Sequence, residues 1–389
     1  MTAFPVGARL AVVERRDRLR VLEMEPDGPV STSLPGRSRW PAWIPGPGKQ
    51  LVFSRGIANG TQSFCVANWE PDAGTEPRTL FQSPAGDATV IAPRVPHYVL
   101  PSPGGGSAAI VAATSQGLAL YIGGTEQADN PPEPVAAGAP LFPAWDPSGR
   151  FLAVHVNSVL MVIDTLTGEH FQSAAEDAVG FRTPAYADDG NTLAFATVVE
   201  GSVQLEFSRP DGTGTKHGPR FPSSTILQFR PGTNELYAAT VADPNSGLLI
   251  NLWKALPGKA ETEMVYRGPF AAFSWSPSGD RILLIYPTHR GDGSFGLYML
   301  DPAGAILAAS EPIVPSDDQR IWLTFFDQYG KSHVQWLNGG ESIVFCGRAG
   351  ADRIAPSLGD SAGPMVYAWS GARGAPLEAI VPGEFAVGR

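Results

Sequence analysis

The chain has 389 residues and a formal net charge of -10, with 43% hydrophobic and only 17% charged residues. The hydrophobic content is ample for a large core and argues against disorder, while the acidic balance argues against a nucleic-acid partner. Glycine and proline are plentiful, at 44 and 37 residues, and this favours short strands joined by tight turns over helices.

The N-terminal segment has no signal-peptide pattern, and no apolar run approaches the roughly 20 residues that a membrane helix needs. We therefore expect a cytoplasmic protein without a membrane partner, or an exported one if a signal has been removed. The two cysteines, Cys65 and Cys346, stand in apolar runs. We interpret them as buried small hydrophobes, with a disulfide or a reactive thiol as the alternative, and we expect no metal site and no cofactor.

A turn motif, Pro-x-Gly-x-x-Leu, recurs along the whole chain. Clear copies are Pro147-Gly149-Leu152 and Pro277-Gly279-Ile282, whereas Asp188 and Asn338 replace the proline in two others. Occurrences begin at residues 5, 45, 103, 147, 188, 231, 277 and 338. Spacings of this size, filled by strands and turns alone, are typical of the four-stranded blades of a β-propeller.

Each turn is followed by predicted strands in a fixed order. An apolar strand comes first, at 10–13, 51–53, 108–113, 152–156, 193–198, 236–241, 282–286 and 343–346. Its apolar character on both faces indicates burial between neighbouring blades. Another strand follows, at 19–24, 64–69, 118–122, 159–164, 203–208, 248–253, 296–301 and 365–370, and then a weaker one, as at 263–266 and 377–381.

The first blade lacks an innermost strand, because only four residues precede Pro5. We expect residues 384–388 to pair into that blade and to close the ring, which removes exposed sheet edges. The prediction is a single all-β domain, a β-propeller of eight four-stranded blades, with seven blades as the alternative. The expected blade boundaries are 1–36 with 383–389, 37–84, 85–138, 139–176, 177–220, 221–267, 268–312 and 313–382.

The segments around Pro143–Ala153 and Phe273–Gly279 resemble the repeats of TolB-type propellers, and similar repeats build the propellers of tricorn-type and prolyl-oligopeptidase-type peptidases. The resemblance covers nearly the whole chain, but only as repeat pattern. Those peptidases use a separate hydrolase domain with a Gly-x-Ser-x-Gly elbow, and we expect the repeats to leave no residues of this chain for such a domain. The resemblance therefore implies a scaffold or ligand-binding propeller.

Three long insertions, 82–96, 312–332 and 347–364, are all expected on the same face of the propeller. Long loops on a rigid scaffold are the usual carriers of function. In the insertion 312–332, Ser316 is a plausible helix cap and Gly330 a plausible helix stop. A strand over 320–326 is the competing interpretation.

Where this insertion meets the central channel, we expect a packed loop whose aromatic side chains plug the channel, with a polar cluster at the channel mouth as the alternative. The candidate binding residues are Trp322, Asp327, Gln328, Tyr329, Lys331, His333, Arg348, His97, Arg182 and Arg230. Trp40 and Trp322 lie off the repeat and are the tryptophans expected to be exposed. His333 and Asp327 are the candidate acid-base pair, but Ser332 and His333 would point to opposite faces of a strand, which argues against a hydrolytic triad.

We favour a non-enzymatic scaffold that binds a protein or peptide partner on the face with the insertions. The alternative is a small-molecule enzyme, a lyase or hydrolase, with its site and ligand at the channel mouth around His333. The fold does not decide between them. A basic run, Arg15-Arg16-Asp17-Arg18-Leu19-Arg20, is interpreted as a solvated hairpin tip, with a docking patch as the alternative.

Overall fold

The structure is a computed structural model. It describes residues 4–34, 36–46, 48–56, 62–68, 77–82, 98–114, 117–125, 133–172, 182–243, 247–350 and 363–389. The chain forms two compact units: unit 1 comprises Met1–Pro101 and Ala271–Arg389, and unit 2 comprises Ser102–Phe270. The assignment of the whole chain to one domain, with its blade boundaries, stays a prediction.

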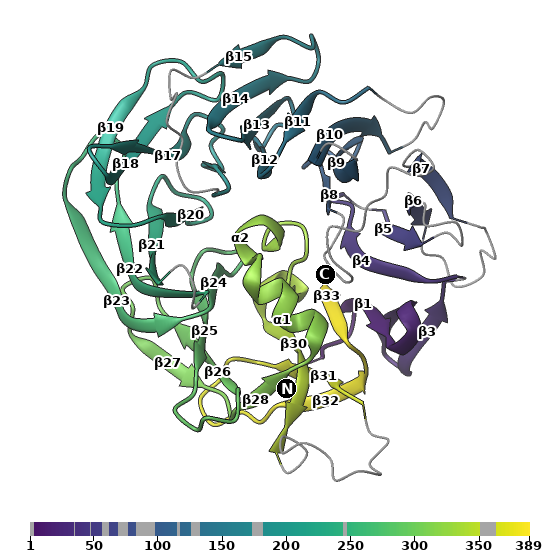
Figure 1. Ribbon diagram of the computed structural model, residues 1–389. Coiled ribbons are helices and arrows are strands. Elements are labelled where there is room, and N and C mark those ends of the chain that lie inside the picture. The colour runs from purple at the N-terminus through teal and green to yellow at the C-terminus, as the bar shows by residue number, and fades with distance from the viewer. Residues whose placement is uncertain are drawn as a thin grey trace. The chain divides into compact units, whose positions relative to one another are not determined.

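Unit 1 begins with two four-stranded antiparallel sheets (Figure 1). The first has the order β3-β2-β1-β33 and contains β1 (Arg9–Glu14), β2 (Arg18–Glu25), β3 (Gly28–Ser33) and β33 (Phe385–Gly388). The second has the order β4-β5-β6-β7 and contains β4 (Ser38–Trp43), β5 (Gln50–Gly56), β6 (Gln62–Asn68) and β7 (Arg78–Gln82). A short 3-10 turn, Arg15–Asp17, joins β1 to β2, and β8 (Tyr98–Pro101) follows β7.

The rest of unit 1 is a joined sheet that carries the helices. Its strands are β24 (Ala272–Trp275), β25 (Ile282–Pro287), β26 (Phe295–Leu300), β27 (Ile306–Ala309), β28 (Ile313–Pro315), β29 (Trp336–Leu337), β30 (Ser342–Ala349), β31 (Met365–Trp369) and β32 (Glu378–Pro382). The short strand β28 pairs with both β26 and β30 and so links two sets of four strands. Helices α1 (Asp317–Thr324) and α2 (Phe326–Tyr329) lie between β28 and β29 in the chain, and a 3-10 turn spans Asn338–Gly340.

Unit 2 contains only strands and turns among its described residues. They are β9 (Ser107–Thr114), β10 (Gly117–Gly124), β11 (Ala136–Gly138), β12 (Leu141–Trp145), β13 (Phe151–Val156), β14 (Val159–Asp164), β15 (His170–Gln172), β16 (Ala185–Tyr186), β17 (Leu193–Val199), β18 (Ser202–Ser208), β19 (Lys216–Phe221), β20 (Thr225–Phe229), β21 (Leu236–Asp243), β22 (Leu248–Ala255) and β23 (Thr262–Phe270). Strands β12–β15, β16–β19 and β20–β23 form three four-stranded sheets in chain order.

The repeat turn has the geometry that its sequence predicts. At Asp146–Gly149 the Gly149 amide donates to the Asp146 carbonyl at 3.0 Å, with Pro147 at the position where its fixed φ suits a turn. Gly149 has φ +73°, a conformation that glycine adopts without strain. The Asp146 carboxylate accepts hydrogen bonds from the amides of Ser148 and Phe151, at 3.1 and 2.7 Å. The turn therefore places the start of β13 directly against the end of β12.

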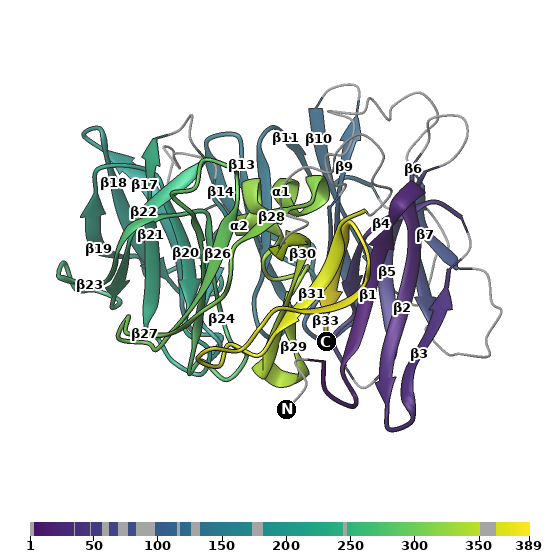
Figure 2. The ribbon, with the colours of Figure 1, turned by 90° about the horizontal axis from the view of Figure 1, so that it is seen from below.

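The C-terminal strand joins the first sheet, as predicted (Figure 2). Strand β33 pairs antiparallel with β1, and Val13 lies opposite Phe385 while Leu10 lies opposite Gly388. The expected apolar strands after each turn are also confirmed, as β1, β5, β9, β13, β17, β21, β25 and β30. The number of blades stays a prediction.

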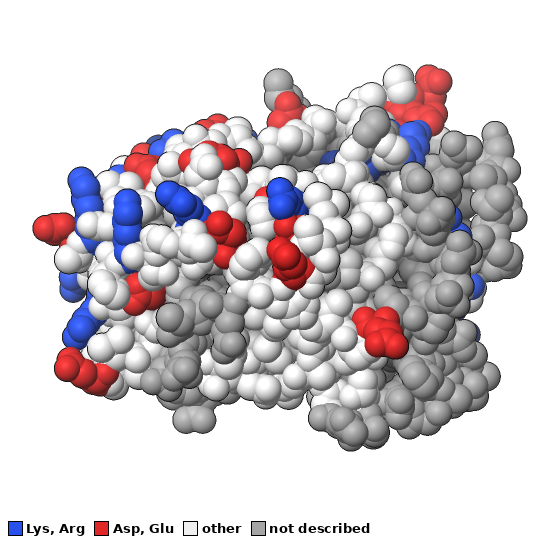
Figure 3. Space-filling model, turned by 90° about the horizontal axis from the view of Figure 1, so that it is seen from above, with Lys and Arg blue, Asp and Glu red and all other residues white. Residues whose placement is uncertain are grey.

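Charged side chains are mixed in sign on the surface of the described chain that Figure 3 shows. Lysine and arginine side chains stand near acidic ones there, with neutral residues between them. This pattern agrees with the low charged fraction of 17%.

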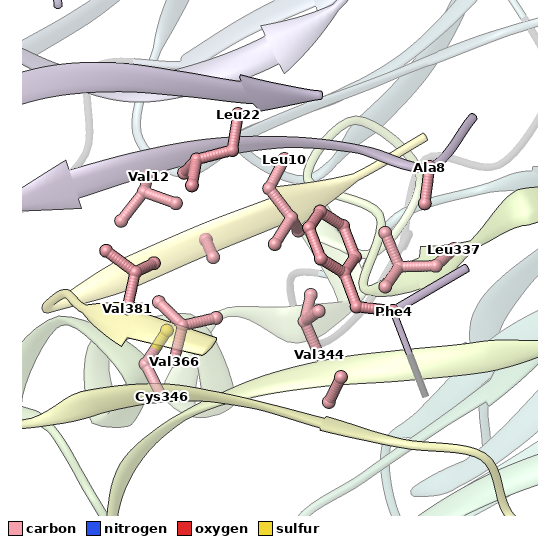
Figure 4. Close-up of a cluster of buried hydrophobic side chains, with 12 residues drawn as sticks. Phe4, Ala8, Leu10, Val12, Leu22, Leu337, Val344, Cys346, Val366 and Val381 are labelled. Atoms are coloured by element: carbon pink, nitrogen blue, oxygen red, sulfur yellow. The ribbon is translucent and has the colours of Figure 1, made fainter. Parts of the chain in front are cut away.

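The core of unit 1 forms between the first sheet and the sheet that carries β30 (Figure 4). Phe4, Leu10 and Val12 from the N-terminal side pack with Val344 and Val366 from the C-terminal side. Cys346 is fully buried in this cluster, and burial raises the pKa of its thiol well above the ordinary value. Its predicted role as a small buried hydrophobe is therefore confirmed, whereas the side chain of Cys65 lies outside the described residues.

Candidate functional site

The insertion 312–332 is helical, as the cap and stop residues predict. The Ser316 hydroxyl accepts a hydrogen bond from the Gln319 amide at 3.1 Å, which caps the N-terminus of α1. Asp317 and Asp318 lie in the first turn, where the helix dipole favours acidic groups. Gly330 follows α2 as its C-cap. The competing prediction of a strand over 320–326 is wrong.

Helix α1 has one exposed and one buried face. Asp317, Arg320 and Thr324 are exposed, at the spacing of one helix face. The helix packs beside β28 and β30 (Figure 1), and its opposite face is buried, with Gln319 and Trp322. The rigid part of the insertion therefore presents a short polar surface.

The expected exposure of two tryptophans is wrong. Trp322 is 2% exposed and Trp40 is 4% exposed. Trp322 is buried because it shares a helix face with Gln319 and packs near Phe326, at 6.4 Å between ring centroids. Trp40 is buried because the backbone turns it into the interior.

That turn is a β-bulge in β4. The pairing of β4 with β5 changes register between Arg39 and Ala42, and Trp40 has φ +51°. A positive φ is rare for a bulky residue, and bulges re-aim side chains next to functional sites. Here the bulge directs the indole towards Tyr329 and Phe385, at centroid distances of 6.4 and 5.0 Å.

His333 lies among these rings. Its imidazole is 6.1 Å from the Trp40 ring, 5.4 Å from Tyr329 and 6.0 Å from Phe385, and it is fully buried. We call Trp40, Tyr329, His333 and Phe385 the aromatic cage. Burial lowers the pKa of His333 to about 4, although a backbone contact with Trp40 partly opposes the shift. The imidazole is therefore neutral at neutral pH.

Ser332 and His333 do meet, contrary to the prediction. The Ser332 hydroxyl and His333 Nδ1 are 2.9 Å apart. The prediction placed both residues on a strand, but β29 begins only at Trp336. The amides of Ser332 and His333 both donate to the Tyr329 carbonyl, at 3.2 and 2.7 Å, so the chain turns tightly here and brings the two side chains together.

Buried amides tie the insertion to the sheet below it. Gln319 Oε1 accepts from Gln335 Nε2 at 3.0 Å and from the Cys346 amide at 3.2 Å. The Ser316 hydroxyl also donates to the Glu384 carbonyl. These bonds fix α1 to β30 and to the residue just before β33, so the helix has a defined orientation on unit 1.

The other predicted site residues are distributed as follows. Asp327 and Gln328 are half-buried on α2, Lys331 is exposed, and Arg348 is half-buried at the end of β30. His97, residues 83–96 of one predicted loop and residues 351–362 of another lie outside the described residues. Among the described candidates, those of the insertion lie in one region of unit 1 together with His333, and Arg348 lies opposite Val314 of the insertion in the sheet.

Arg182 and Arg230, both in unit 2, have local roles. The Arg182 carbonyl lies 2.5 Å from His155 Nδ1. Arg230 Nη1 donates to Glu235 Oε2 at 2.9 Å. Unit 2 also has a cavity of about 290 Å3 lined by Asp188, Asp189, Gly232, Thr233 and Asn234, but both carboxylates already accept hydrogen bonds from neighbouring turns. Among the described residues, no cluster of three potential metal ligands is present.

An ionic chain connects the hairpin tip between β1 and β2 to α1, and the sequence did not reveal it. Arg39 donates to the Asp17 carboxylate, with Nε 2.6 Å from Oδ1, and its Nη1 is 3.8 Å from Asp318 Oδ1. Arg37 Nη2 donates to Asp17 Oδ2 at 2.8 Å. The basic run was visible in the sequence, but the contributions of Arg37, Arg39 and α1 depend on tertiary packing.

No family model matches the chain. Over 88 residues it is 30% identical to dipeptidyl-peptidase 5 of Porphyromonas endodontalis, a match that covers 22% of this chain and 13% of that relative. The matched part is thus a small fraction of the relative's length. Within the described part of the chain, none of the helices is both long and apolar enough to cross a lipid bilayer.

Solved structures show the fold. A eukaryotic initiation factor is similar with a TM-score of 0.55 and 10% identity, over 98% of both chains. A prolyl endopeptidase is similar with a TM-score of 0.55 and 11% identity, over 89% of this chain and 50% of its own. TolB from Acinetobacter baumannii has a TM-score of 0.40 and 15% identity, over 86% of this chain and 80% of its own. Together with the four-stranded antiparallel sheets, the first two likenesses establish the all-β, β-propeller fold class; membership of the TolB-type repeat family stays a prediction.

Proposed function

We propose that this chain is a non-enzymatic propeller scaffold that binds a protein or peptide partner on the face that carries the insertion 312–332. The observation that carries the proposal is the division of roles between α1 and the histidine that follows the insertion. His333, directly after the insertion, is buried in the aromatic cage, while Asp317, Arg320 and Thr324 form the outward face of α1. Loops on rigid scaffolds commonly carry binding surfaces.

Rigidity supports this role for α1. The helix is capped by Ser316, and its buried face is hydrogen-bonded through Gln319 to β30. A surface that is ordered before binding loses less conformational entropy when a partner docks. The predicted loops 82–96 and 347–364 would extend the same surface.

The alternative is a small-molecule lyase or hydrolase around His333. The contact between the Ser332 hydroxyl and His333 Nδ1 favours it, because a nucleophile and its base need this proximity. Complete burial of the imidazole opposes it, since a general base must reach its substrate. The binding role is therefore the one we propose.

Site-specific photocrosslinking tests the proposal. A photoreactive residue replaces Thr324 on the exposed face of α1. In a matched control it replaces Asp27, which is exposed in the turn between β2 and β3. In lysate of the source organism, the Thr324 probe should give a discrete protein adduct that the Asp27 probe does not give. The adduct should persist in a His333→Gln background. Absence of the adduct, or equal adducts from both probes, contradicts the proposal, and an adduct that requires His333 supports the alternative.

A further inference from the structure

Arginine side chains gather at the hairpin tip between β1 and β2. Arg15, Arg16 and Arg18 come from the tip itself, and Arg37 comes from the segment before β4. All four are exposed, with side-chain exposures of 60% for Arg15, 66% for Arg18 and 75% for Arg37. We call these four residues the arginine patch.

The acidic groups that the structure describes near the patch are less exposed than its arginines. Glu14, Asp17 and Glu384 have side-chain exposures of 8%, 13% and 25%. Glu14 is 3.4 Å from Arg18 Nη2, and Glu384 is 4.0 Å from Arg15 Nε. The carboxylates therefore hold the guanidinium groups, while the outer surface of the patch is positive.

The backbone of the tip is held in an unfavourable conformation. Arg16 has φ +65° and Asp17 has φ +62°, a region that costs residues with a Cβ about 1–2 kcal/mol each. Asp17 is fixed there by its bonds to Arg37 and Arg39. Arg16, in contrast, makes no hydrogen bond or ion pair with any described residue. Its guanidinium is thus presented to solvent on a constrained turn.

We infer that the arginine patch docks an Asp- and Glu-containing segment of the protein partner. This inference rests on the proposed function and specifies the chemistry of that partner. Arg39 connects Asp17 of the tip to Asp318, a buried residue of α1, so the tip and the helix are neighbours in unit 1. Guanidinium groups bind carboxylates in bidentate fashion, and they bind better when their geometry is fixed in advance.

An acidic peptide fits this patch better than a nucleic acid does. Nucleic acids require extended neutralisation of phosphates, whereas the patch has four exposed arginines on a chain with a net charge of -10. Long-range repulsion by that charge opposes a polyanion, but a short segment with a few carboxylates contacts only the local positive field.

Fluorescence anisotropy with a short labelled peptide of alternating Glu and Ser tests the inference. The patch variant is Arg16→Ala/Arg18→Ala/Arg37→Ala. The control variant, Arg209→Ala/Arg267→Ala/Arg373→Ala, removes three other exposed arginines and so changes the net charge equally. We expect the patch variant to bind about tenfold more weakly than wild type and the control to bind within about twofold. A Gln-Ser peptide should not bind.

Equal binding by wild type, patch variant and control overturns the inference, as does absence of binding to wild type. Tighter binding of a single-stranded oligonucleotide than of the peptide, lost in the patch variant, would also overturn it. Circular dichroism and thermal melting verify that both variants fold. The crosslinking assay separates the two proposals: if the Thr324 adduct persists in the patch variant, protein binding stands and the assignment to the arginine patch fails.

Discussion

Two regions of the molecule each bury one histidine, and they do so in different ways. His155 belongs to β13, a strand of a regular sheet in unit 2, where Nδ1 contacts the Arg182 carbonyl at 2.5 Å. His333 follows the helical insertion of unit 1, where Nδ1 contacts the Ser332 hydroxyl at 2.9 Å. Burial lowers the pKa of both side chains to about 4.

The comparison shows that a shifted pKa does not by itself identify a catalytic histidine. The regular repeat produces the same shift as the insertion, because the cause in both places is removal from water. What distinguishes the two is the surrounding structure: a strand supplies the burial of His155, whereas the aromatic cage supplies that of His333. Changes to the cage should therefore affect only His333.

Trp40→Ala should have the largest effect. Removal of a buried tryptophan typically costs about 3–5 kcal/mol of the free energy of unfolding. Because the indole covers His333, water should enter, and the pKa of His333 should rise towards 6.5 while that of His155 stays near 4. Urea unfolding measures the stability, and NMR titration of the imidazole protons measures both pKa values.

Trp369→Ala is the control for this experiment. Trp369 is also fully buried in unit 1, in β31, but it lies outside the aromatic cage. The Trp369→Ala substitution should reduce the free energy of unfolding by a similar amount without a change in the pKa of His333. An unchanged pKa in Trp40→Ala would show that the cage does not cause the shift.

Acidification should destabilise the protein through both histidines. In the folded chain each has a pKa of about 4, below the ordinary 6.5, so the neutral form stabilises the fold. This contribution is complete above about pH 6.5 and declines as the pH falls towards 4, by about 3 kcal/mol per histidine. Urea unfolding between pH 7 and pH 4.5 measures the decline.

The substitutions His155→Gln and His333→Gln should each remove about half of the pH dependence assigned to histidines. The effects should add in the double variant, because the two residues share no hydrogen-bond partner among the described residues. If one substitution removed the whole dependence, the two buried sites would not be electrostatically equivalent, and the comparison would fail.

Local sequence patterns predicted the repeat well, because its determinants are close in sequence. Proline and glycine specify the turn at Asp146–Gly149, and an apolar strand follows each turn of this kind. Even the pairing of β33 with β1 could be predicted, since the first blade lacked a strand. Ser316 and Gly330 likewise predicted the limits of the helical insertion.

The candidate site was less predictable, because tertiary contacts determine it. The bulge at Trp40 has one local signal, Pro41, which cannot donate to the strand ladder, but the direction of the indole depends on rings that are distant in sequence, Tyr329 and Phe385. The contact between Ser332 and His333 was wrongly excluded, because the start of β29 was placed too early. The hairpin tip between β1 and β2 is likewise distant in sequence from α1, so the ionic chain through Arg39 forms only after folding.

The smallest loss of stability should come from side chains that hydrogen-bond to the backbone at the start of α1 and in the repeat turn. Ser316→Ala removes the cap of α1 and should cost about 1 kcal/mol. Asp146→Ala, its counterpart in the regular repeat, removes a carboxylate that accepts from the amides of Ser148 and Phe151. Hydrogen exchange should report faster exchange at Gln319 in the first variant and at Phe151 in the second.

The two variants should differ in how far the change spreads. Ser316 lies in an insertion, so its loss should accelerate exchange in α1 while β1 and β33 remain protected. Asp146 fixes the turn between β12 and β13, so its loss should also accelerate exchange in those strands. If Ser316→Ala also exposed the amides of β33, its hydroxyl bond to the Glu384 carbonyl would be the reason, and the insertion would then support the pairing of β33 with β1 as well as present a binding surface.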